Sequence, residues 1–137
     1  MAWYDTAQLS KIQNAKERED WFTAIVLSAT QIERHGYLEV VEYLESFEVD
    51  SKLIEKTFER VYLRQIAEYL LILDKIDKNE YNAILKINTE RNNFIHRRKE
   101  EEFKRGKEGK KLYSKLIDEA IRILIEKLNV KRLLISK

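Results

Sequence analysis

Apolar residues recur along this chain at the three- and four-residue spacing of amphipathic helices. The first stripe consists of Phe22, Ile25, Val26, Ala29, Tyr37, Val40, Val41 and Leu44. Because these residues keep one helical phase, we predict a long helix from near Thr6 to about Ser46, with Asp5 as its N-cap. Gly36 falls on the apolar side, where a glycine indicates either a close approach of another helix or a kink. The sequence leaves both interpretations of Gly36 open.

Three further apolar stripes follow the first. The second begins after a helix start signal at Asp50 or Ser51 and ends near Asp74. The third opens at Asp77, where Glu80 three residues later makes a variant of the capping box. The fourth consists of Tyr113, Leu116, Ile117, Ala120, Ile121, Leu124 and Leu128. Amphipathic helices joined by short connections predict an all-α fold, an antiparallel bundle of four to five helices.

The composition agrees with a single helical domain over residues 1–137. A chain of 137 residues with 44% hydrophobic residues is long enough for one core, and it contains no proline and only three glycines. No apolar run approaches the roughly 20 residues that a membrane span needs. The N-terminus lacks the basic stretch, apolar block and small-residue cleavage site of a secretory signal. We therefore expect a cytoplasmic protein that does not associate with membranes.

This sequence contains few residues suited to metal binding or thiol chemistry. Cysteine is absent, which excludes disulfides and thiol catalysis. His35 and His96 are the only histidines, too few for an ordinary structural zinc site, and neither stands three residues after a glutamate as in di-iron helical bundles. We expect no metal and no cofactor, and we interpret His35 as a structural or surface residue.

The net charge of +2 is the difference between two opposed parts of the chain. Residues 1–90 contain 11 basic and 17 acidic side chains, whereas residues 91–137 contain 15 basic and 7 acidic ones. The densest basic stretch is residues 97–111, with eight basic and four acidic side chains. Such a run is either a solvated connection between helices or a surface that contacts phosphates.

Polar residues interrupt the apolar face of the third predicted helix. Continuing its stripe by the helical period leads to Asn88, Arg91 and Asn92, and His96 lies four residues beyond Asn92. Polar groups on such a face are costly to bury unless they are paired or border a cleft. Arg91 and His96 are about 140° apart on an ideal helix, so they converge only at a helix edge, at a distorted helix end or across a two-fold axis.

The segment from Arg91 through Asn92 to His96 resembles the R-x4-6-H signature of HEPN domains, which are small all-α bundles. As in many active members of that family, a polar residue directly follows the arginine. The resemblance implies a metal-independent endoribonuclease, commonly a toxin of a toxin–antitoxin or defence system. It also implies a homodimer whose two motifs face one cleft, and an antitoxin protein as a further partner.

The resemblance also implies a role for each residue of the motif. Arg91 would hold the scissile phosphate, His96 would act as general acid or base, and Asn92 would orient one of them. These roles suit the side chains, because arginine is permanently charged and histidine titrates near neutral pH. Within the basic stretch, we predict that the RNA-binding residues are Arg97, Arg98, Lys99, Lys104 and Arg105.

One position departs from a common extension of the motif. Toxins of this kind that are silenced by modification carry a tyrosine two residues after the histidine, where this chain has Arg98. Another mode of control is therefore expected. The alternative hypothesis is a non-catalytic helical module that binds a nucleotide or a protein, in which the same polar cluster binds the ligand or ties helices together.

Overall fold

The structure is a computed structural model that describes residues 2–96 and 106–130, with side chains from Ala7 onward. The described residues form six α-helices and no strand, which confirms the all-α class. The helices are α1 (Ala2–Glu17), α2 (Trp21–Glu45), α3 (Ser51–Phe58), α4 (Leu63–Ile72), α5 (Lys78–Ile95) and α6 (Gly106–Glu126). In the described part of the chain, the helix count is thus higher than the four to five expected.

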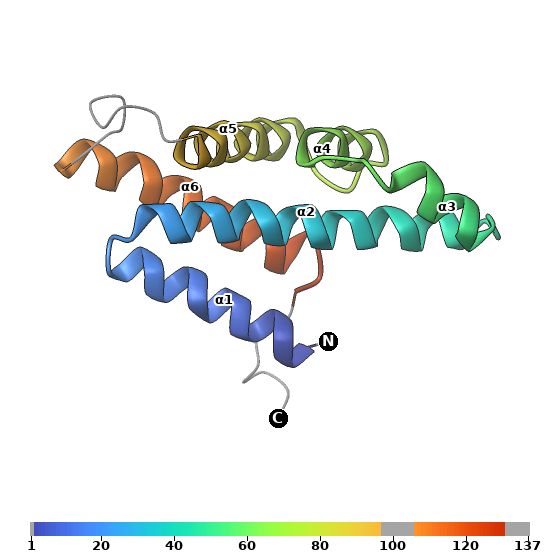
Figure 1. Cartoon of the computed structure of the whole chain (residues 1–137), viewed down its shortest axis with the longest axis horizontal. Helices are drawn as coiled ribbons and strands as arrows, with labels where there is room; N and C mark the ends of the chain where they lie inside the picture. The colour runs from blue at the N-terminus through green and yellow to red at the C-terminus, as the bar shows by residue number, and fades with distance from the viewer. Residues whose placement is uncertain (1, 97–105, 131–137) are drawn as a thin grey trace.

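Helix α2 is the central element of the fold. It packs against α1, α4, α5 and α6, while α3 packs against its C-terminal part only. Helices α4 and α5 follow one another along one side of α2, and α1 lies along another side (Figure 1). Every side chain of the candidate motif is therefore positioned by α5 and by its contacts with α2 and α6.

The expected continuous helix from Thr6 to Ser46 is wrong. The chain breaks between α1 and α2, where Glu19 adopts a left-handed φ of 58° and Asp20 caps the new helix by accepting from the Thr23 N–H at 3.2 Å. Asp5 lies inside α1 and is not an N-cap. The apolar phase on which the expectation rested belongs to α2 alone, and an aspartate with a free carboxylate oxygen favours a helix start.

The second predicted helix is also divided, into α3 and α4. Its start is confirmed, since the Asp50 carboxylate accepts from the Leu53 N–H at 3.0 Å. A second start lies at Tyr62, whose N–H donates to the Gln65 side chain at 2.9 Å. The capping box of α5 is confirmed in both directions, because Asp77 and Glu80 each accept from the other's backbone N–H at 2.8 Å.

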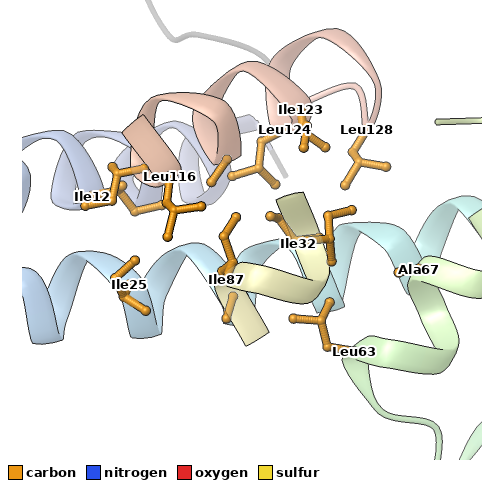
Figure 2. Close-up of a cluster of buried hydrophobic side chains, with 14 of the residues drawn as sticks. Ile12, Ile25, Ile32, Leu63, Ala67, Ile87, Leu116, Ile123, Leu124 and Leu128 are labelled. Atoms are coloured by element: carbon orange, nitrogen blue, oxygen red, sulfur yellow. The ribbon is translucent and has the colours of Figure 1, made fainter. Parts of the chain in front are cut away.

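Branched aliphatic side chains from α1, α2, α4, α5 and α6 meet in one core. Figure 2 shows part of it, with Ile25 and Ile32 of α2 facing Ile87, Leu116 and the C-terminal part of α6. Gly36 is buried where α2 crosses α4, and a Cβ atom there would lie 2.5 Å from Cγ2 of Ile66. Of the two interpretations of Gly36, the structure therefore supports the close helix–helix approach.

Candidate functional site

The Arg91 side chain lies between α5 and α2. Its Nη2 donates to Oδ1 of Asn88 at 2.9 Å, one turn earlier on the same helix. Its Nη1 lies 3.5 Å from Oε1 of Glu33 on α2, in an ion pair that joins the two helices. The side chains of Arg91 and Glu33 are 15% and 30% exposed, so the pair is half-buried and can be reached from solvent.

His96 and Asn92 lie elsewhere on the same helix. His96 is the C-cap residue of α5 and is exposed, and its backbone N–H donates to the Asn92 carbonyl at 2.9 Å. The Asn92 side chain is also exposed. The partners of the Arg91 guanidinium are Asn88 and Glu33, and not Asn92 or His96. The described residues thus place the three members of the motif at one helix end, where the Arg91 guanidinium is held by Asn88 and Glu33.

The residues predicted to bind RNA lie outside the described part of the chain. These are Arg97, Arg98, Lys99, Lys104 and Arg105. The basic stretch continues into the described residues at the start of α6, where Lys107, Lys110 and Lys111 are exposed. Lys110 pairs weakly with Glu19, at 3.9 Å between Nζ and Oε2. The N-terminal turns of α6 therefore present lysines to solvent.

Aromatic contacts fix the end of α5 that carries the motif. The Phe94 ring meets Phe22 of α2 edge to face at 5.9 Å between ring centroids, and it lies 5.5 Å from Tyr113 of α6. Phe22 and Ile95 are nevertheless 50% and 48% exposed. Two exposed apolar side chains, which together we call the Phe22–Ile95 patch, therefore lie near His96: Ile95 precedes it in the chain, and Phe22 contacts Phe94.

A groove between α2 and the start of α4 adjoins the Arg91 pair. Its volume is about 340 Å³. Glu33 belongs both to this groove and to the ion pair with Arg91. The lining residues are Thr30, Glu33, Arg34, Tyr37, Leu38, Val61 and Ile66. Sequence reasoning missed Glu33, because an ion pair between residues 58 positions apart leaves no periodic signal.

A second charged cluster joins α5 to α6. The Glu80 carboxylate is almost fully buried and lies 3.0 Å from Nη2 of Arg122 and 3.5 Å from Nζ of Lys127. Hydrogen bonds to Glu119, and then to Glu80 and Glu126, raise the pKa of Arg122 above its ordinary value, against the opposing effect of burial. Since each charge is paired, removing one partner would leave a buried charge without compensation.

Neither a metal-binding cluster nor a membrane-spanning helix occurs among the described residues. No group of three or more histidine, aspartate or glutamate side chains there could hold a metal ion. None of the described helices combines the length and the apolar character needed to cross a membrane. Comparison of the chain with protein-family models, with curated proteins and with solved structures finds no match.

Proposed function

We propose that this protein is a metal-independent endoribonuclease of the HEPN type, a toxin or defence enzyme that cleaves single-stranded RNA. The observation that carries the proposal is the placement of Arg91. A permanently charged guanidinium is held by Asn88 and Glu33, is still reachable from solvent, and lies on the same helix end as an exposed histidine. An HEPN-like bundle would present its motif on a helix in this way.

The proposed reaction needs a cation and a proton carrier. The ribose 2′-oxygen forms a bond to the adjacent phosphorus, and the bond from phosphorus to the 5′-oxygen breaks. His96 takes the 2′-hydroxyl proton or gives a proton to the leaving 5′-oxygen, while Arg91 stabilises the charge that develops on the phosphate. Asn92 orients one of these groups. The products are a 2′,3′-cyclic phosphate and a 5′-hydroxyl.

A homodimer would complete the site. Arg91 and His96 are about 140° apart on an ideal helix, so two copies related by a two-fold axis can bring Arg91 of one protomer to His96 of its partner. The Phe22–Ile95 patch supports this arrangement, because it offers an apolar contact surface next to His96. The exposed lysines at the start of α6, which packs against α5, would then lie on the same side of each protomer as the end of α5.

A second candidate function is a non-catalytic module that binds a nucleotide or a protein. It is favoured by the ion pair between Arg91 and Glu33, since such a pair can simply tie α2 to α5. In that case Arg91 would be a structural residue. Its loss would then reduce stability without altering any reaction.

Cleavage of RNA in the presence of EDTA separates the two functions. We expect the purified protein to cut single-stranded RNA and to leave cyclic phosphate ends, and we expect His96→Ala to abolish cutting at unchanged helicity and melting temperature. Arg91→Ala should also be inactive. The matched control is Arg64→Ala, which removes an exposed arginine that pairs with Glu68 on α4 and should leave activity unchanged. Intact RNA at high protein concentration, or cutting by His96→Ala, would refute the nuclease.

A further inference from the structure

The ion pair between Glu33 and Arg91 joins α2 to the motif on α5. The geometry points to Glu33 as a positioning residue, which holds the Arg91 guanidinium in the orientation that receives the scissile phosphate. This inference rests on the proposed nuclease function. It adds to the site a residue from another helix, 58 positions earlier in the chain.

The two contacts of Arg91 act on different nitrogens of its guanidinium. Nη2 is held by Asn88 at 2.9 Å, and Nη1 faces Glu33 at 3.5 Å. A guanidinium is planar and rigid, so two contacts from two helices fix the direction of the plane as well as the position of the charge. It carries five N–H donors, and the remaining ones are left for a ligand.

The ion pair is longer than a strong hydrogen bond, so Glu33 orients the Arg91 guanidinium without occupying all of its N–H donors. A charge-assisted hydrogen bond between nitrogen and oxygen is typically about 2.7–2.9 Å long. At 3.5 Å, Glu33 attracts Nη1 and fixes its direction, while N–H donors of the guanidinium are left for a phosphate oxygen. Glu33 also lines the groove between α2 and the start of α4, so the pair adjoins a concave surface.

If the pair between Glu33 and Arg91 only stabilises the fold, its loss should not affect catalysis specifically. Glu39 provides the comparison. Glu39 also lies on α2, and its Oε1 is 3.8 Å from Nζ of Lys75, a comparable pair distant from the motif along the helix. Its other oxygen accepts from Asn129 at 2.9 Å. The variants Glu33→Gln and Glu39→Gln therefore make the same chemical change on the same helix. A structural role predicts that both variants lower the melting temperature and that neither has a specific effect on catalysis.

Steady-state cleavage of a single-stranded RNA oligonucleotide is the first test. We expect Glu33→Gln to lower kcat by about tenfold, because a guanidinium that is out of position stabilises the transition-state charge on the phosphate less well. KM should fall by about twofold, since the ground state loses a carboxylate that repels phosphate. Glu39→Gln should leave both constants unchanged. A kcat of Glu33→Gln within twofold of the wild type, or an equal loss in both variants, would overturn the inference.

A second measurement needs no catalysis. Nitrogen-15 NMR follows rotation of the Arg91 guanidinium, with Arg91→Lys identifying the signal by its loss. Slow rotation is expected in the wild type and in Glu39→Gln, and fast rotation in Glu33→Gln. Rotation that is fast in the wild type, or unchanged in Glu33→Gln, would refute the positioning role. If positioning holds but wild-type protein leaves RNA intact, the proposed function fails and the placement of Arg91 by Glu33 stands.

Discussion

The carboxylate of Glu80 and the guanidinium of Arg122 meet across the interface of α5 and α6, at 3.0 Å between Oε2 and Nη2. Glu80 also accepts from the Asp77 N–H at the start of α5, so one buried side chain caps its own helix and anchors the next one. Each oxygen of Glu80 makes one of these contacts: Oε1 accepts from the Asp77 N–H, and Oε2 pairs with Arg122.

The first prediction concerns this double role. Replacing Glu80 by alanine removes the cap contact and leaves Arg122 and Lys127 without a buried partner, so we expect a loss of about 2 kcal/mol in the free energy of unfolding. Urea denaturation measures it. The matched control is Glu126→Ala, which removes an exposed partner of the same Arg122 and should cost less than about 0.5 kcal/mol. Equal losses would show that burial of Glu80 is unimportant.

Gly36 gives a second prediction. Alanine is the better helix former by about 1 kcal/mol, yet its Cβ would lie 2.5 Å from Cγ2 of Ile66 and 3.1 Å from Cδ1 of Leu70. We expect Gly36→Ala to destabilise the fold by about 1–3 kcal/mol, because α2 and α4 must separate.

The cause of that loss can be tested in a double-mutant cycle. Ile66→Ala removes the atom that the new Cβ would meet, so the two changes together should cost less than the sum of their separate costs. Strictly additive losses would mean that Gly36→Ala acts through something other than the contact with Ile66.

These residues also show what the sequence could and could not predict. The capping box at Asp77 and Glu80 is a local pattern, and it was predicted because a helix start depends on neighbouring residues. The burial of Glu80 against Arg122 and the pair between Glu33 and Arg91 depend on which helices pack together, and no periodicity records that. The break at Glu19 lies before Phe22, the first residue of the apolar stripe, so the periodicity carries no information about it.

The third prediction concerns the lysines at the start of α6. If Lys107, Lys110 and Lys111 contact phosphates, replacing all three by glutamine should weaken RNA binding by the inactive His96→Ala protein and make binding less salt-dependent. Each lost contact should reduce the slope of log K against log salt by about 0.7 for a single strand.

A matched triple variant shows whether position matters. Lys11, Lys52 and Lys56 are exposed on α1 and α3, and their replacement by glutamine makes the same change in net charge. Fluorescence anisotropy at several salt concentrations compares the two variants. If both triple variants lose the same affinity, RNA binding reports total charge and gives no support for a phosphate-contacting surface at α6.

The last prediction tests whether one active site needs two protomers. Arg91→Ala and His96→Ala chains should each be inactive, but in a mixed dimer the intact Arg91 of one protomer can meet the intact His96 of the other. Random mixing makes half of the dimers mixed, and each regains one of its two sites, so we expect about a quarter of wild-type activity. A site built within one chain would recover nothing, because neither chain holds both residues.

Adding Ile95→Asp to both chains places a charge in the Phe22–Ile95 patch. It should abolish the recovery of activity and give a monomer mass in light scattering. Ile72→Asp, on an exposed position of α4, should leave the recovery intact.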